Sequence, residues 1–242
     1  MTDTETIQKI VSSLNKAKKS IRVLARKEPF SAISIGQNCN TAWYLKQVGA
    51  RTEAYPFDWI FCSAEIIESC MRDGFSIFLD RQYITPKKDR HAAGHSVYHE
   101  NMFHHRSPIQ TEEDYNYYVR CIERFKRKLS SGDRIMFVCT LINEPDKRPA
   151  WSSGFCNKYL LPTAQSYDTY ESFMKYAGEI NPNLIYLFIE QYTQGKLTID
   201  SEIVKDNVLS IKFTSQGSND GVMYLDEFDD SIVKSLYSGL II

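Results

Sequence analysis

A cysteine stands at the junction of two predicted elements near the start of the chain. Residues 31–35 (Ser-Ala-Ile-Ser-Ile) are typical of a short strand and residues 40–48 of a helix, and the stretch between them contains Gly-Gln-Asn-Cys, ending in Cys39. The unpaired N–H groups and dipole of a helix N-terminus favour a thiolate over a thiol. Cys39 is therefore a candidate nucleophile for covalent catalysis, and the residues alone leave a structural thiol equally open.

The two residues before Cys39 are amides, Gln37 and Asn38. Attack of a thiolate on a carbonyl creates an oxyanion, which needs nearby hydrogen-bond donors. We expect these two side chains, together with backbone N–H groups at the helix start, to supply such donors or to bind substrate. The alternative is a plain turn, since Asn and Gly are common turn residues.

All five histidines of the chain lie within one short window, from His91 to His105. A cysteine nucleophile needs a group that takes its proton, and imidazole is the usual one. The residues preceding Phe103 have a strand-like pattern, so the histidines that follow it lie at a strand end. We expect His104 to be the base, followed in preference by His105 and then His99; His105 is also a candidate for binding the substrate.

A metal site is the alternative use of these histidines. His91, His95 and His99 are four residues apart, a spacing that would place them on one face of a helix as zinc ligands require. The chain has no His-Glu-x-x-His sequence, and a glycine interrupts the segment. We expect no metal and no cofactor, and a metal-dependent hydrolase using the 91–105 window remains an alternative.

A carboxylate flanked by aromatic residues follows in the segment Tyr-Pro-Phe-Asp-Trp-Ile, residues 55–60. Asp58 is the candidate for orienting a catalytic histidine, as the third member of a triad does. The alternative is an aspartate that stabilises a turn between two core aromatics. Trp59 is a candidate for binding substrate.

The order of predicted elements indicates the fold class. Apolar strands near residues 33, 135, 184 and 208 alternate with amphipathic helices, which is typical of a mainly parallel sheet covered on both faces. We predict one α/β domain over residues 1–242, a three-layer sandwich, with an N-terminal helix at about 3–27 and a long polar loop at about 80–110. Sites on such sheets form at the carboxyl ends of strands, and Cys39 follows one of them.

Composition narrows the function classes. The 242 residues include 29 Lys and Arg against 30 Asp and Glu, and this balance gives no indication of nucleic-acid binding. No apolar run approaches the ~20 residues of a membrane span. The six cysteines show no Cys-x-x-Cys pair and no secretory signal is visible, so we expect free thiols and a cytoplasmic location. The oligomeric state is not encoded in any recognisable pattern.

The same residues resemble a bacterial domain family of unknown function labelled "putative papain-like cysteine peptidase". The resemblance rests on Gly36 to Cys39, on Gly49 and Arg51, and on Pro-Phe-Asp-Trp at 56–59; Phe103-His104 matches an aromatic-His motif further along. Gln37 stands where the family pattern has Ser, and His105 where it has Asp. The resemblance implies Cys39 as the nucleophile and His104 as the base.

The family label implies a papain-like α+β fold, which is the alternative to the parallel-sheet sandwich. For function, residues and resemblance together predict a cysteine-dependent hydrolase or acyl transferase acting on a peptide, ester or thioester carbonyl. Its substrate would be a small molecule, a peptide or a glycan. The non-enzymatic alternative is a module that binds glycans or peptides in a bacterial surface-polysaccharide pathway.

Overall fold

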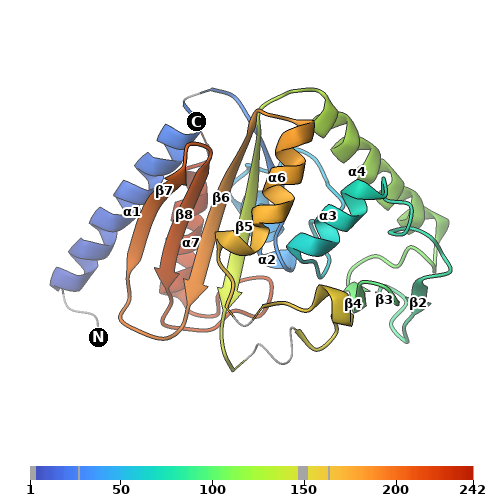
Figure 1. Cartoon of the computed structure of the whole chain (residues 1–242). Coiled ribbons are helices and arrows are strands. Elements are labelled where there is room, and N and C mark those ends of the chain that lie inside the picture. Colours follow the sequence, from blue (N-terminus) through green and yellow to red (C-terminus); the bar gives the residue numbers. More distant parts are fainter. Residues whose placement is uncertain (1–3, 27, 147–151, 163, 242) are drawn as a thin grey trace.

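A five-stranded sheet forms the centre of the computed structural model, which describes residues 4–26, 28–146, 152–162 and 164–241 (Figure 1). The strand order is β1-β5-β6-β8-β7, and every pairing is parallel except that of β7 with β8. The strands are β1 (Ser31–Ser34), β5 (Ile135–Asn143), β6 (Leu184–Tyr192), β7 (Ile199–Lys205) and β8 (Val208–Thr214).

Strand β5, which lies between β1 and β6, is buried on both faces because helices cover both sides of the sheet. Phe137 and Cys139 point into one hydrophobic cluster, whereas Met136 and Val138 point into the other. Alternation of this kind follows from the two-residue period of a strand. The continuous apolar sequence of β5 is thus explained by burial on two sides, as expected for a parallel sheet.

Two sets of helices form the outer layers. The first cluster is covered by α3, α4 and α6, and the second by α1, α2 and α7. Figure 1 shows α6 and α3 on one side of the sheet, with α7 and α2 behind it. The helices are α1 (Thr4–Leu24), α2 (Cys39–Gln47), α3 (Ala64–Arg72), α4 (Glu112–Ser130), α6 (Glu171–Ile180) and α7 (Glu227–Ser238).

The predicted three-layer sandwich with a mainly parallel sheet is therefore confirmed. The papain-like α+β alternative is not what the structure shows, because the helices sit on both faces of a single parallel sheet instead of apart from an antiparallel barrel. The N-terminal helix covers Thr4–Leu24; its expected ends at residues 3 and 27 lie outside the described residues. None of the helices in the described ranges has the length and apolar character needed to cross a bilayer.

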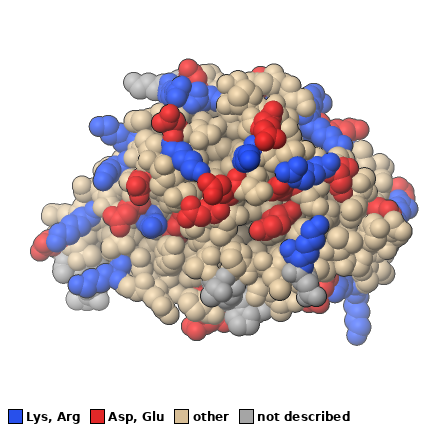
Figure 2. Space-filling view, viewed as in Figure 1, with Lys and Arg blue, Asp and Glu red and all other residues tan. Residues whose placement is uncertain are grey.

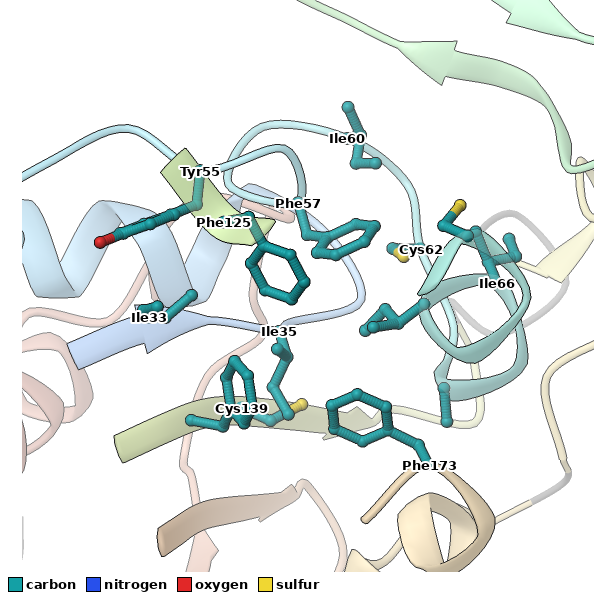
Figure 3. Packing of buried hydrophobic residues seen from close by; sticks show 14 of the residues in the cluster. Ile33, Ile35, Tyr55, Phe57, Ile60, Cys62, Ile66, Phe125, Cys139 and Phe173 are labelled. Carbon is teal, nitrogen blue, oxygen red and sulfur yellow. The ribbon is translucent and has the colours of Figure 1, made fainter. Parts of the chain in front are cut away.

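Aromatic side chains from the 55–60 segment pack against the first strand. Figure 3 shows Phe57 and Phe125 together above Ile35, which directly follows β1. The rings of Phe57 and Phe125 meet edge to face with centroids 5.5 Å apart, a favourable aromatic geometry. This packing anchors the loop that carries Asp58 and Trp59 to the sheet.

The segment 80–110 is more ordered than the sequence indicated. It contains a small antiparallel sheet of three strands, β2 (Ile84–Pro86), β3 (Ala93–His95) and β4 (His99–Phe103). These strands are too short and too polar to produce a clear alternating pattern. The end of β4 is nevertheless where the sequence indicated a strand, and it delivers the following histidines to the main sheet.

Candidate active site

The cysteine at the carboxyl end of β1 is the first residue of α2, where the sequence placed it. Asn38 caps this helix, since its side-chain oxygen accepts a hydrogen bond from the Asn40 N–H at 3.1 Å. The cap leaves Cys39 in the first turn. Asn38, which was predicted to help bind an oxyanion, therefore also positions Cys39 by capping α2.

Gly36 lets α2 approach the strand closely. A Cβ built on Gly36 would lie 2.4 Å from the Thr41 hydroxyl oxygen, so a side chain does not fit there. That hydroxyl in turn accepts the backbone N–H of Thr140, in β5, at 2.9 Å. Together these contacts fix the height of Cys39 above the sheet.

The histidine beside the cysteine is His105. Its Nε2 lies 3.3 Å from the Cys39 Sγ, within hydrogen-bond reach for sulfur. His104, the preferred base from the sequence, instead has its ring against Phe61 and against His105, with centroids 6.0 and 5.5 Å apart. The two histidines are adjacent after β4, and sequence alone has no means of telling which of them faces the sulfur.

Burial governs the protonation of the pair. Cys39 is 7% exposed, and loss of solvent raises the pKa of its thiol to about 12, although a backbone hydrogen bond at Cys39 acts in the opposite direction. Partial burial, with a contribution from His104, lowers the pKa of His105. The helix start was expected to stabilise a thiolate, but desolvation is the larger effect, so the resting pair is a neutral thiol and a neutral imidazole.

Asp58 is bound to an arginine, and no imidazole is among the partners found for it in the described residues. Its carboxylate accepts hydrogen bonds from Arg51 Nε at 2.8 Å and from the Tyr55 N–H at 2.9 Å. Burial raises the pKa of Asp58 to about 6, outweighing the opposing effect of the Arg51 charge. The direct orienting contact predicted from triad logic is therefore replaced by an ion pair inside the loop.

Trp59 links this ion pair to the catalytic candidates. The Arg51 guanidinium lies over the Trp59 ring, 5.7 Å from its centroid. The same ring meets His105 edge to face, with centroids 6.0 Å apart. Asp58 is thus linked to His105 indirectly, through the Arg51 guanidinium and the Trp59 ring.

Gln37 accepts hydrogen bonds from two other segments of the chain, and its side-chain donor has no partner among the described residues. Its side-chain oxygen accepts the Ile142 N–H at 3.2 Å, and its carbonyl accepts the Cys62 N–H at 2.9 Å. The remaining side-chain atom, Nε2, is buried with no hydrogen-bond partner in the part of the chain that the structure describes. A buried amide donor without a partner is costly, and a catalytic role is one explanation for such a group.

A segment near the C-terminus, which sequence reasoning did not assign to the site, also borders Cys39. The carbonyl of Val222 accepts a hydrogen bond from Asn40 Nδ2 at 3.1 Å, and the charge of Asp220 raises the pKa of the Cys39 thiol. Gly221 has φ +95°, a conformation that favours glycine. The Asp-Gly pair signals a turn in the sequence, but nothing local indicates that the turn packs on residue 40.

The remaining histidines do not form the metal-binding helix face that was the alternative use of this window. His95 and His99 lie opposite each other on β3 and β4, so the spacing of four residues belongs to a hairpin and not to a helix. The His95 Nε2–H donates to the Ile77 carbonyl at 3.1 Å, and its Nδ1 accepts the Val97 N–H. Across the described residues there is no cluster of three or more His, Cys, Asp or Glu side chains suited to a metal ion.

A cavity of about 1080 Å³ opens beside His105. Its walls come from α2, from the 51–59 segment, from residues 90–91 and from the beginning of α4. A cavity of this size accommodates a ligand of drug-like dimensions or a few residues of a peptide. His105, whose Nε2 lies 3.3 Å from the Cys39 Sγ, therefore lines a space in which a substrate fits.

The family model for DUF1796, described as "Putative papain-like cysteine peptidase", matches residues 31–151. The chain belongs to this family. The matched region includes both members of the Cys39–His105 pair and the Arg51–Asp58 ion pair. Searches of curated proteins and of solved structures find no match.

Membership in DUF1796 supports a cysteine hydrolase at a coarse level and specifies no substrate. The family name refers to papain, yet the DUF1796 region here contributes β1 and β5 to a parallel sheet. The matched region ends before β6, β8 and the segment that carries Val222, all of which complete the sheet or the site. The family name suggests cysteine-peptidase chemistry on a papain-like fold, whereas this member of the family has an α/β fold with a mainly parallel sheet.

Proposed function

We propose that this protein is a cysteine-dependent hydrolase or acyl transferase that acts on a peptide, ester or thioester carbonyl. The observation that carries the proposal is the 3.3 Å separation of Cys39 Sγ and His105 Nε2 at the carboxyl end of a parallel strand. A nucleophile and a base within hydrogen-bond reach are the signature of covalent catalysis. The adjoining cavity supplies room for the substrate.

The protonation of the pair determines the mechanism. Because burial favours the neutral thiol and the neutral imidazole, proton transfer accompanies attack. His105 Nε2 takes the thiol proton as the bond between Cys39 Sγ and the carbonyl carbon forms. His105 then gives this proton to the leaving amine, alcohol or thiol as its bond to carbon breaks, which leaves an acylated Cys39. Water or another acceptor, deprotonated by His105, releases the acyl group and restores the thiol.

Two groups serve in this proposal as donors to the oxyanion of the tetrahedral intermediate. One is the backbone N–H at the start of α2, which already contributes to lowering the pKa of the Cys39 thiol. The other is Gln37 Nε2, a buried donor with no protein partner among the described atoms. Donors held ready for a developing negative charge are among the largest contributors to catalysis.

Asp58 acts in this scheme as a positioning residue. It fixes Arg51, Arg51 covers Trp59, and the edge-to-face contact with Trp59 holds the His105 ring. Trp59 also lines the cavity, so it is placed to contact substrate. Because all six cysteines are unpaired, we place the enzyme in a reducing compartment, the cytoplasm.

Trapping of an acyl-enzyme tests the proposal. We expect p-nitrophenyl acetate or a longer activated ester to add one acyl group to Cys39, located by mass spectrometry of the peptides. Cys39→Ala abolishes the adduct, and His105→Ala slows its formation by about 100-fold, the lower range for loss of a general base. The matched control, His104→Ala, removes the neighbouring imidazole and changes the rate by less than about threefold.

Acylation that is spread over several cysteines, or that is equally fast in His105→Ala, would contradict the assignment. A larger loss of acylation rate in His104→Ala than in His105→Ala would mean that His104 is the base. Folding of each variant is checked by circular dichroism, so that loss of rate is not mistaken for loss of structure.

The second candidate is a non-enzymatic module that binds peptides or glycans. The specific observation in its favour is the raised pKa of the Cys39 thiol, which makes an unactivated sulfur inert. On this alternative the cavity beside His105 binds ligand without turnover, and no activated ester acylates Cys39 faster than it acylates the denatured chain.

A further inference from the structure

The cavity beside His105 differs from the rest of the surface in charge. Its lining includes Lys46, Arg51, Arg90 and Arg106 but only two acidic side chains, Glu113 and Asp114. The whole chain has nearly equal numbers of basic and acidic residues. The face shown in Figure 2 carries both signs interspersed, in keeping with that balance.

Two of the four cations are already neutralised within the protein. Arg51 pairs with Asp58 at 2.7 Å, and Arg106 pairs with Asp114 at 2.9 Å. Lys46 and Arg90 have no carboxylate partner in the described ranges; the Arg90 Nε donates to the His91 imidazole at 3.0 Å. Glu113, also in the lining, has no cationic partner among the described residues, so the cavity presents two unpaired cations against one unpaired carboxylate.

The position of Lys46 relative to Cys39 follows from helix geometry. Cys39, Trp43 and Lys46 are spaced i, i+4 and i+7 on α2, so they lie along one face of the helix. Two turns separate the first from the last, which is about 10 Å along the axis. Trp43 and Lys46 line the cavity, and Cys39 lies behind His105, which lines it too, so the sulfur and the ammonium group stand toward opposite ends of this face.

The wall between these ends suits an apolar spacer and offers one further donor. Trp43 and Trp59 line the cavity, and Trp43 Nε1 is a buried N–H with no hydrogen-bond partner among the described residues. Aromatic side chains flanked by a few polar groups are typical of small-molecule sites. Cys39, Trp43 and Lys46 thus present a thiol, an aromatic ring and a cation, in that order, along this face of α2.

We propose that the substrate of this site carries an anionic group about 10 Å from its reactive carbonyl carbon, bound by Lys46 and Arg90. This inference rests on the proposed function for the position of the carbonyl, but the anion site itself does not. A carboxylate and a phosphate share the required chemistry, and the experiment separates them.

The binding experiment uses the Cys39→Ala variant of the full chain, which has no nucleophile. Two of the three tryptophans of the chain line the cavity, so their fluorescence reports occupancy. We expect nonanedioate to change the fluorescence saturably, and its neutral dimethyl ester to bind about fivefold more weakly. Titration with inorganic phosphate shows whether a phosphate competes for the same cations.

Charge variants locate the anion site. Lys46→Met and Arg90→Met each keep an unbranched side chain and remove the charge, and we expect each to weaken nonanedioate binding by about fivefold. Lys19→Met removes an exposed lysine from α1, outside the lining of the cavity, and serves as the control. Equal affinity for nonanedioate in the Lys46→Met, Arg90→Met and Lys19→Met variants would overturn the proposal.

A kinetic experiment separates this inference from the proposed function. The mono-p-nitrophenyl ester of nonanedioate, with its free carboxylate, is compared with the same ester methylated at the far end. Faster acylation of Cys39 by the anionic ester, lost in Lys46→Met, supports both. Acylation without preference refutes the anion site and leaves the enzyme intact, whereas anion binding without acylation retains the site and refutes the enzyme.

Discussion

At the scale of the residue, protonation is decided by burial more than by the helix dipole. The sulfur of Cys39 is in the first turn of α2, where the dipole favours negative charge, yet desolvation raises its pKa to about 12. The partial charge of a helix end is worth up to about 2 kcal/mol, and burial of a thiolate costs more than that. Catalysis at such a residue requires a base, which is why the 3.3 Å contact with His105 is the central feature of the site.

The pH dependence of alkylation follows from this pKa. The thiolate is the reactive form, and below the pKa its fraction rises about tenfold per pH unit. We expect alkylation of Cys39 by iodoacetamide to keep rising from pH 6 to pH 10, because this whole range lies below about 12. Peptide mapping of the labelled protein over this range measures the rate.

The denatured protein provides the control, since all six thiols then have ordinary pKa values and the rates level off above pH 9. A rate for Cys39 that is constant from pH 6 upward would mean a preformed thiolate–imidazolium pair. That result would contradict the neutral resting pair and the proton transfer that accompanies attack.

At the scale of the element, the connection between β1 and α2 sets the position of the nucleophile. Asn38 supplies the cap, Gly36 permits the close approach, and Thr41 connects the helix to β5. These three residues around Cys39 therefore have a structural role. They hold a short helix against the end of a parallel sheet.

Replacing Gly36 tests this packing. In Gly36→Ala the new Cβ would lie 2.4 Å from the Thr41 hydroxyl oxygen and 2.8 Å from the Thr41 Cβ, so α2 must move. We expect the free energy of unfolding to fall by about 2 kcal/mol, typical of overpacking a closed site. Chemical denaturation followed by circular dichroism measures this change.

Gly178→Ala is the matched control for that substitution. Gly178 is in α6, and a Cβ there has nothing within 4 Å. Alanine is a better helix former than glycine, so the variant gains up to about 1 kcal/mol. Equal stability of Gly36→Ala and the wild-type chain would show that the close approach to Thr41 is not required.

At the scale of the whole molecule, the site depends on both halves of the chain. Cys39 and His105 come from the region matched by the DUF1796 model, whereas Val222 and β6, the partner strand of β5, come from outside it. The register of β5 with β6 runs from Ile135 to Asn143. Without β6, a strand buried on both faces would become an exposed edge.

A fragment ending at residue 151 tests this dependence. We expect residues 1–151 not to fold, because β5 loses its pairing with β6 and the apolar side chains of both clusters lose their cover. Amide hydrogen exchange of the fragment, with the full chain as control, is the measurement. Protected amides in β5 of the isolated fragment would show that the family-matched region folds by itself.

The sequence indicated much of the architecture because its signals are local and strong. The apolar runs of β5 and β6 and the capped helix α4 were recognisable from pattern alone. The antiparallel edge strand β7 is not among the strands predicted above, because its outer face is polar and its pattern is weak. Strands β2 and β3 were missed for a similar reason, since each has three residues, whereas the end of β4 was indicated.

For the site, residue type and spacing selected Cys39, the histidine window and the Asp58 segment, because these depend only on the chemistry of the side chains. Tertiary structure decided which imidazole meets the sulfur, that Asp58 pairs with Arg51, and that Val222 lies beside residue 40. Those outcomes depend on how a strand end and two loops are oriented in space. They also depend on how much water reaches each group, and both are properties of the packed molecule that no local pattern records.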